Sequence, residues 1–171
     1  MSEGELALPA GVPASTRAGT DPVDAAQVVA AFREEHGPMV RLGYLLLGDV
    51  EEAEDVVQSA YATLVERWDR VREPGAYLRR CVVNGCYDVL RRRRRRRSVP
   101  LADPVPAVAA ADEYLLDAVQ ALPPKQRIVV VLRYYQGLRS HEVAACTGWP
   151  EGTVKSLHHR ALATLRGVIE P

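Results

Sequence analysis

Apolar residues in this chain recur at steps of three and four, and no stretch alternates one by one as a surface strand would. The spacing is cleanest over residues 50–69, where it predicts an amphipathic helix with one buried stripe. The predicted stripe consists of Ala53, Val56, Val57, Ala60, Tyr61, Leu64, Val65 and Trp68. The opposite face carries Glu51, Asp55 and Gln58, with acidic residues near the helix start, as the helix dipole favours. The sequence therefore predicts an all-α fold.

Further helices are expected on both sides of this one. The first covers residues 24–47 with a possible break at Gly37 and Pro38, and Asp49 is a suitable N-cap for the second. A third begins at Pro74 and runs into seven consecutive arginines, 91–97, whose mutual repulsion predicts a frayed end unless a polyanion neutralises it. Its predicted buried stripe is Leu78, Cys81, Val82, Gly85 and Val89. Four more helices are expected at 112–122, 125–135, 140–148 and 150–169, the third with Ser140 as its N-cap.

The chain divides into four parts by composition. Residues 1–22 are acidic and rich in Gly, Pro, Ala and Thr, which predicts a disordered tail. Residues 99–111 contain three prolines and no basic residue, which predicts a flexible linker. Two small helical domains, 23–98 and 112–171, are expected on either side of that linker.

Charge is strongly segregated although the net charge is zero. Residues 1–65 carry a net charge of −8 and residues 66–98 a net charge of +8. Residues 99–124 carry −4 and residues 125–171 carry +4. Blocks of opposite sign indicate a basic face that binds phosphates and an acidic face that binds a different partner. An acidic tail that is merely solvated is the alternative.

Several classes of protein are disfavoured. The start lacks the apolar core of a signal peptide, and the apolar runs are too short to span a bilayer, so a soluble, cytoplasmic protein is expected. Cys81, Cys86 and Cys146 provide neither a disulfide framework nor metal-ligand spacing, and we expect neither a metal nor a cofactor. No arrangement of catalytic side chains is apparent, so an enzyme is not expected.

The segment 140–160 is typical of a helix-turn-helix. Gly148 provides the turn, and the second helix starts with the run 152–156, of sequence GTVKS. Its polar face carries Thr153, Lys155, Ser156, His159 and Arg160, side chains that bind phosphates and base edges. Arg139 and the free N–H groups after Ser140 are further candidates for phosphate binding. A helical hairpin that binds protein is the alternative.

Another basic face is predicted on the helix that ends in the arginines. Arg79, Arg80, Asn84, Tyr87 and Arg91 all lie off its predicted apolar stripe. Tyr87, Tyr77 and Trp68 offer rings on which unpaired bases can stack, although Trp68 fits the core better. A solvated tail or a nonspecific RNA-binding arm would show the same arginine run.

Four segments in order resemble the bacterial sigma-70 family. Residues 48–58 (GDVEEAEDVVQ) are similar to its core-polymerase-binding motif, and residues 77–84 (YLRRCVVN) to its −10 element helix. Residues 122–127 (LPPKQR) and 152–156, followed by Arg160 and Ala161, are similar to its region 4. The absence of a third region between them resembles the extracytoplasmic-function (ECF) group, and the amino-acid sequences of the motifs resemble its actinobacterial SigE-like subset.

The resemblance implies a role for each face. Glu51, Asp55 and Gln58 would bind the clamp helices of the polymerase β′ subunit. The set Arg79, Arg80, Asn84, Tyr87 and Arg91 would open the −10 element, with a flipped base near Asn84. The second domain would pack on the β flap and read the −35 element, and an anti-sigma factor would be a possible further partner.

The chain departs from the family pattern at two positions. Leu157 stands where many members have arginine, and the periodicity places Leu157 in the core, so a phosphate contact is expected to be missing. Pro150 replaces a small polar cap at the start of the recognition helix. Two other functions remain open at this point: a free-standing helix-turn-helix regulator, and an adaptor that binds polymerase without reading DNA.

Overall fold

The computed structural model describes residues 25–96 and 111–169 of the 171-residue chain. These residues form helices and their connections, with no strand among them, and the predicted all-α fold is confirmed. The predicted tail 1–22 and all of the predicted linker 99–111 except Ala111, the first residue of a helix, lie outside the described residues. The helices are α1 (Ala25–Leu47), α2 (Val50–Glu66), α3 (Pro74–Arg96), α4 (Ala111–Ala121), α5 (Pro124–Tyr134), α6 (Ser140–Thr147) and α7 (Glu151–Ile169).

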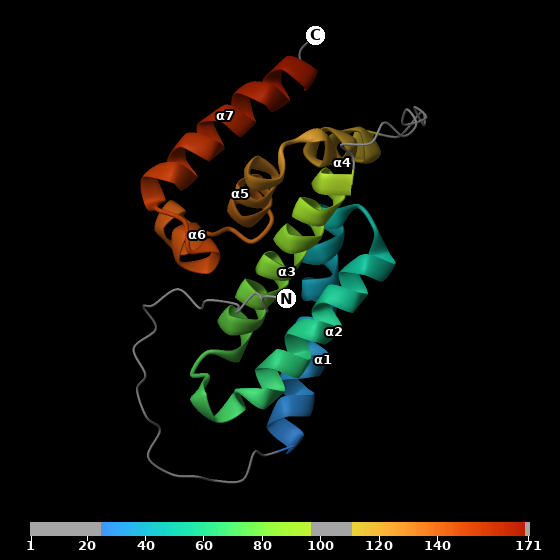
Figure 1. Cartoon of the computed structure of the whole chain (residues 1–171), viewed down its shortest axis with the longest axis vertical. Coiled ribbons are helices and arrows are strands. Elements are labelled where there is room, and N and C mark those ends of the chain that lie inside the picture. Colours follow the sequence, from blue (N-terminus) through green and yellow to red (C-terminus); the bar gives the residue numbers. More distant parts are fainter. Residues whose placement is uncertain (1–24, 97–110, 170–171) are drawn as a thin grey trace, which may run out of the picture.

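The helices are arranged as two units in contact (Figure 1). The first unit is a three-helix bundle in which α1, α2 and α3 each pack against the other two. The second unit contains α4 to α7, with α5 and α7 packed together and α6 beside both. Helices α5 and α6 also pack on α3, so the second unit rests against one side of the bundle.

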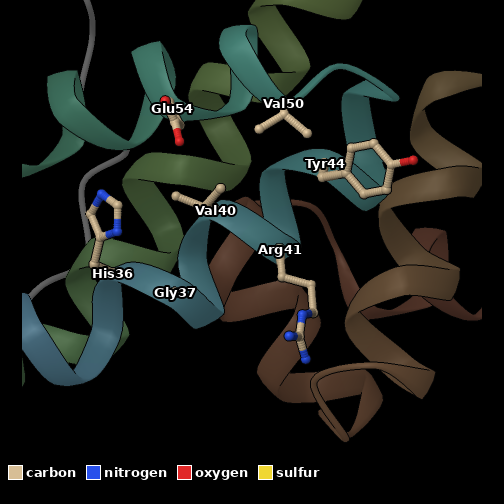
Figure 2. A pocket seen from close by; sticks show the side chains of 7 residues that line it. All are labelled: His36, Gly37, Val40, Arg41, Tyr44, Val50 and Glu54. Atoms are coloured by element: carbon tan, nitrogen blue, oxygen red, sulfur yellow. The ribbon is translucent and has the colours of Figure 1, made fainter.

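Helix α1 is continuous, and the predicted break at Gly37 and Pro38 is wrong. A proline inside a helix removes one backbone hydrogen bond and frees the carbonyl four residues earlier, here that of Glu34. Both Glu34 and Pro38 are exposed, so water can serve the freed carbonyl. A shallow hollow of about 370 Å³ lies next to this point, between α1 and the start of α2 (Figure 2). It is lined by His36, Gly37, Val40, Arg41, Tyr44, Val50 and Glu54.

Helix α2 follows the predicted periodicity over most of its length. Asp49 is its N-cap, as predicted, and its carboxylate accepts a hydrogen bond from the backbone N–H of Glu52 at 3.0 Å. Two predicted core positions differ. Val65 is about half exposed, and Trp68 lies beyond the helix in a 3₁₀ turn (Trp68–Arg70), half-buried against the core. The helix ends at Glu66, so the stripe does not continue past that residue.

The buried stripe of α3 is shifted by one residue from the prediction towards its C-terminal end. Cys86 and Leu90 are buried where Gly85 and Val89 were expected. Gly85 and Val89 are half-buried, and Gly85 still faces α2, since a Cβ atom built on it would lie 2.8 Å from Cγ1 of Val56. The buried residues of α3 are Leu78, Val82, Val83, Cys86 and Leu90.

The arginine-rich end of α3 remains helical to Arg96, so fraying is not observed there. Arg93 explains part of this, because its guanidinium donates to the Glu52 carboxylate at 2.6 Å and to the Leu47 carbonyl at 2.7 Å. One of the like charges is therefore neutralised by a protein group of the same unit.

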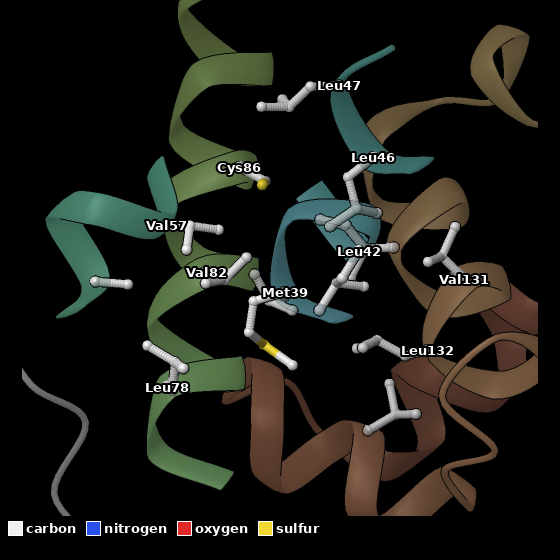
Figure 3. Close-up of a cluster of buried hydrophobic side chains, with 14 of the residues drawn as sticks. Met39, Leu42, Leu46, Leu47, Val57, Leu78, Val82, Cys86, Val131 and Leu132 are labelled. Carbon is white, nitrogen blue, oxygen red and sulfur yellow. The ribbon is translucent and has the colours of Figure 1, made fainter. Parts of the chain in front are cut away.

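A single hydrophobic cluster runs through both units (Figure 3). Met39, Leu42 and Leu46 of α1 lie at its centre, with α3 side chains on one side of them and α5 side chains on the other. Val131 and Leu132 bring α5 into this cluster. Val143 and Val154 extend it to α6 and α7. A smaller cluster holds α4, α5 and α7 together through Ala118, Leu122, Val130, Ala161 and Leu165.

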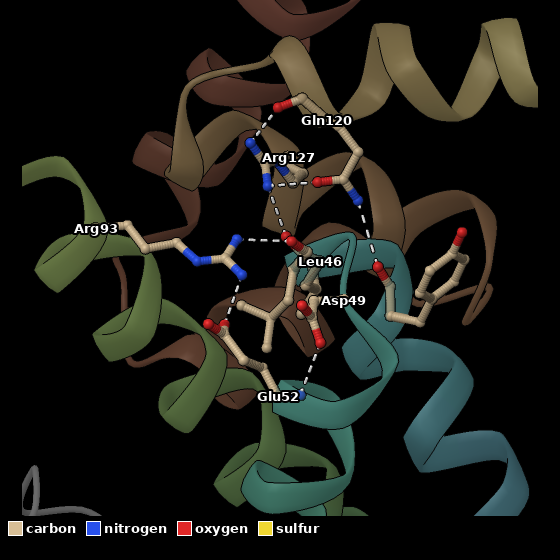
Figure 4. Close-up of polar contacts among 8 residues, drawn as sticks. Leu46, Asp49, Glu52, Arg93, Gln120 and Arg127 are labelled. Carbon is tan, nitrogen blue, oxygen red and sulfur yellow. Dashed lines mark hydrogen bonds and ion pairs between the residues drawn. The ribbon is translucent and has the colours of Figure 1, made fainter. Parts of the chain in front are cut away.

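Polar side chains join the two units at the C-terminal end of α1 (Figure 4). The last four carbonyls of a helix have no partner within it. Gln120 of α4 donates through Nε2 to the carbonyls of Tyr44 (3.3 Å) and Leu45 (2.7 Å). Arg127 of α5 donates to the carbonyl of Leu46 at 2.6 Å, and Arg93 completes the set at Leu47. Three of the four terminal carbonyls of α1 are thus capped by side chains of the second unit.

Candidate nucleic-acid and protein interfaces

The exposed face of α2 carries the predicted protein-binding residues. Glu51, Asp55 and Gln58 are all exposed and lie on the side of α2 away from its buried residues. The buried side chains on the other side of α2 anchor the helix in the core. The face is therefore rigid, acidic and open to a partner.

The predicted basic face of α3 is only partly open. Asn84 and Arg91 are exposed, whereas Arg79, Arg80 and Tyr87 are half-buried. Tyr87 contacts the ring of Trp149 edge-on, with 5.6 Å between ring centroids. The Cζ atom of Arg91 lies 5.8 Å from the centroid of the Tyr87 ring. The five residues do share one helix, but the helix-turn-helix lies against part of the set.

A basic hollow that the sequence did not single out lies at the end of this face. It has a volume of about 340 Å³ and is lined by Tyr87, Arg91, Arg94 and Arg95. Arg94 and Arg95 are exposed, so their charge is available to an anion. The arginine run had indicated a polyanion, but it did not distinguish these two from Arg93, which is paired within the protein.

The second helix of the helix-turn-helix, α7, presents an open polar face. Lys155, Ser156, His159 and Arg160 are exposed, and Thr153 is half-buried. Two of them find partners within the helix: Lys155 pairs with Glu151 at 2.8 Å, and Arg160 donates to the Ser156 hydroxyl at 3.0 Å. The hydrogen bond from Lys155 and its charge lower the pKa of the Glu151 carboxyl.

The apolar side of α7 fits the prediction for Leu157. Leu157 is buried together with Val154, so its side chain is not available to DNA. Gly148 ends α6 with a φ of 74°, a left-handed conformation that favours glycine. The turn of the helix-turn-helix is therefore at the predicted residue.

The start of α6 differs from the prediction by one residue. Ser140, expected as the cap, is the first helical residue and is half-buried, and the N-cap position belongs to the exposed Arg139. The Glu142 carboxylate accepts a hydrogen bond from the Arg139 backbone N–H at 2.6 Å, which supplies the local partner. Glutamate therefore stabilises this turn, where serine had been expected to do so.

The three cysteine thiols are free. Burial raises the pKa of Cys86 to about 12 and that of Cys146 to about 11, so both thiols are protonated at neutral pH. Within the described part of the chain no group of His, Cys, Asp and Glu residues is arranged to hold a metal ion.

Sequence reasoning missed several contacts between distant segments, within the units as well as between them. Gln120, Arg127 and Arg93 cap α1, and Lys125 lies over the Trp149 ring at 5.1 Å from its centroid. Their partners lie tens of residues away in the sequence, where periodicity gives no signal.

Among the described helices none is both long enough and apolar enough to cross a membrane.

Two family models match the chain: Sigma-70 region 2 over residues 31–96, and Sigma-70 region 4 over residues 112–165. The RNA polymerase sigma-E factor of Streptomyces avermitilis is 36% identical over 149 residues, which cover 81% of this chain and 82% of the relative. The ECF RNA polymerase sigma factor SigM of Mycobacterium tuberculosis is 34% identical over 142 residues, covering 78% of this chain and 72% of the relative. The chain therefore belongs to the sigma-70 family of RNA polymerase sigma factors, in the ECF group.

A solved structure shares the fold. The sigma factor RpoE of Bartonella quintana, crystallised in complex with the anti-sigma factor NepR, superposes with a TM-score of 0.68 at 20% identity. The match covers 84% of this chain and 97% of the RpoE chain. The two-unit helical architecture is thus one that sigma factors adopt.

Proposed function

We propose that the chain divides the work of a sigma factor among the three faces described above. The α2 face (Glu51, Asp55, Gln58) binds the clamp helices of the β′ subunit of core polymerase. The α3 face (Arg79, Arg80, Asn84, Tyr87, Arg91) opens the −10 element. The −35 element is read from α7 by Thr153, Lys155, Ser156, His159 and Arg160, with Arg139 and Ser140 at its phosphates, while the second unit contacts the β flap.

The observation that carries this proposal is the exposed acidic face of α2. A free-standing regulator would need only the helix-turn-helix, and it would have no use for a rigid acidic helix outside the DNA-binding unit. An adaptor that does not read DNA would have no use for the open basic face of α7. Both faces on one chain support a protein that carries polymerase to a promoter.

The remaining assignments follow from this role. We propose no catalytic residue, because polymerase performs the chemistry, and no cofactor. A cytoplasmic location fits partners that are core polymerase and promoter DNA. An anti-sigma factor is a further class of partner that the α2 and α3 faces would suit.

Run-off transcription is the direct test. Core polymerase with this chain should initiate at a defined promoter in a genomic fragment library, whereas core polymerase alone should not. If the chain binds DNA tightly by itself but never activates core polymerase, the regulator is the better description.

A double variant tests the polymerase face. Asp55→Ala with Gln58→Ala should weaken binding of core polymerase by about 2 kcal/mol or more, the size expected when central interface residues are truncated. Glu34→Ala, an exposed acidic residue on α1, is the matched control and should bind normally. Equal retention of core polymerase by the double variant and the control in a pull-down would refute the assignment of this face.

A further inference from the structure

One edge of α7 carries a pair of polar side chains that none of the three proposed faces uses. The hydroxyl oxygen of Tyr134, at the end of α5, lies 3.2 Å from Nε2 of His158 on α7, and the ring centroids are 5.7 Å apart. Tyr134 is 64% exposed, the largest value among the exposed large hydrophobic side chains of the described residues. Its ring therefore contributes little to the core, and its hydroxyl is open to a ligand.

The pair borders the residues proposed to read the −35 element. His158 follows Lys155 by three positions, so the two side chains are neighbours on one side of α7. The short segment after Tyr134 leads directly to Arg139 at the start of α6, which is proposed above to meet phosphates. The end of α5 and the start of α6 thus lie close along the chain to a single edge of the helix-turn-helix.

The groups that face His158 are basic. Burial lowers the pKa of His158 below 6.5, and the charges of Arg133 on α5 and His159 on α7 act in the same direction. Arg133 is itself held in place, because its guanidinium donates to the Leu138 carbonyl at 2.9 Å. In the free chain His158 is therefore mostly neutral at pH 7 and lies in a positive potential, which an anion would relieve.

The carboxylates in the first turns of α6 and α7 already have partners. Glu151 pairs with Lys155 at 2.8 Å, and the hydrogen bond and charge of Lys155 lower its pKa, with a smaller contribution from the charge of His141. Glu142 accepts a hydrogen bond from the backbone N–H of Arg139 at 2.6 Å. Donors therefore prevail at this edge, as the binding of a phosphate requires.

The protonation state of His158 decides what the Tyr134 hydroxyl can do. A neutral imidazole with its proton on Nδ1 accepts at Nε2, and the hydroxyl proton is then used within the pair. An imidazolium donates from Nε2 to the hydroxyl oxygen, which leaves the hydroxyl proton free for a phosphate oxygen. The charge of that phosphate in turn favours the imidazolium.

We propose that Tyr134 and His158 bind a backbone phosphate of the −35 duplex at the edge of α7, and that His158 takes up a proton as the complex forms. Such a contact positions the duplex and reads no base. Because binding is coupled to proton uptake, affinity for the duplex rises as the pH falls towards 6. The inference rests on the proposed function of α7, and the test separates the two.

Two variants remove the parts of the site one at a time. Tyr134→Phe removes the hydroxyl and keeps the ring, and His158→Gln keeps a polar side chain that cannot carry a charge. Tyr135→Phe is the matched control, since Tyr135 is the next residue, is also exposed, and has no hydrogen bond to its hydroxyl among the described residues.

The measurement is the affinity of holoenzyme for a fluorescent promoter fragment identified by run-off transcription, at pH 6 and pH 8. At pH 6, Tyr134→Phe and His158→Gln should each bind on the order of five-fold more weakly than Tyr135→Phe, equally for every −35 sequence. At pH 8 the difference should shrink. The dependence of log affinity on log salt at pH 6 should be shallower by roughly 0.9 for His158→Gln, the value for one phosphate contact.

Arg160→Ala in the same assay separates the site from the proposed function. If Arg160→Ala weakens binding but Tyr134→Phe matches Tyr135→Phe at both pH values, the phosphate site is overturned and the function of α7 stands. If Arg160→Ala also has no effect, both proposals fail. A loss limited to certain −35 sequences would identify a base contact, and poorer retention of core polymerase by Tyr134→Phe in a pull-down would identify a protein contact. Either result overturns the phosphate site.

Discussion

The basic faces of α3 and α7 are similar in composition but differ in accessibility. On α7 the polar side chains are exposed and find their partners one turn away on the same helix. On α3 half-buried residues lie against α6 and Trp149, which come from another part of the chain. A helix alone therefore does not determine whether its basic face can bind DNA, because packing by a distant element can remove that face from solvent.

Arg127→Ala should have the largest effect. Arg127 helps to hold the second unit against α1, and this contact between the units keeps part of the α3 face half-buried while the α7 face stays open. The carbonyls of Leu46 and Leu122, which are buried, and that of Gln120, which is partly buried, would each lose a donor. Loss of donors to buried acceptors costs about 1–3 kcal/mol each, and the shared relaxation of the site suggests a total of about 3 kcal/mol in the free energy of unfolding. Urea denaturation followed by circular dichroism measures this change.

Arg139→Ala is the control for that experiment. Arg139 is an exposed arginine of the same unit, and its removal should change the free energy of unfolding by less than about 0.5 kcal/mol. If Arg127→Ala unfolds at the same urea concentration as this control, the buried guanidinium does not hold the two units together.

Arg160→Ala tests the open face and should have an intermediate effect. If Arg160 reads a base in the −35 element, its loss should reduce discrimination at that position by about 1–3 kcal/mol. Ser156→Ala, which removes only the hydroxyl that Arg160 contacts, should have a smaller effect. Quantitative binding of holoenzyme to −35 variants is the measurement. A uniform loss over all sequences would instead identify Arg160 as a phosphate contact.

The smallest expected effect is a dependence of the free energy of unfolding on pH, caused by His158 of α7. His158 lies 3.2 Å from the Tyr134 hydroxyl, and burial lowers its pKa below 6.5, with the charges of Arg133 and His159 contributing in the same direction. The folded chain therefore binds this proton less readily than the unfolded chain does. Stability should rise with pH through the interval between the lowered pKa and 6.5, and should fall as the solution is acidified below 6.5.

Thermal unfolding between pH 5 and 8, a range in which only histidine among ordinary side chains titrates, measures this dependence. His158→Gln should unfold with a flatter pH profile, whereas the exposed His141→Gln should keep the wild-type slope. Identical slopes for both variants would show that the neutral form of His158 is not favoured by folding.

Local patterns in the sequence predicted the parts that depend on near neighbours. The buried residues Ala53, Val57, Ala60 and Leu64 of α2 follow directly from the 3.6-residue period, and Gly148 marked the turn before α7. Leu157 was placed in the core by the same argument. These features depend on residues within one or two turns, which is the range that periodicity describes.

Contacts between distant segments were not predictable in this way. The buried stripe of α3 faces several helices at once, because α1, α2, α5 and α6 all pack on it, and one charge of its arginine run pairs with Glu52, 41 residues away. Periodicity indicates that a face is buried, but it does not indicate which element buries it. For this reason Gln120 and Trp149, ordinary in the sequence, proved to lie at the contact between the units.

The crossing at Gly85 has one more consequence. Helix α2 carries the proposed polymerase face and α3 carries the proposed −10 face, and the missing side chain at Gly85 lets the two axes approach until Val56 fills the space. A larger side chain at residue 85 would force the two helices apart or displace Val56. The spacing between the proposed polymerase face and the proposed −10 face would then depend in part on the absence of one methyl group, at the residue that follows Asn84.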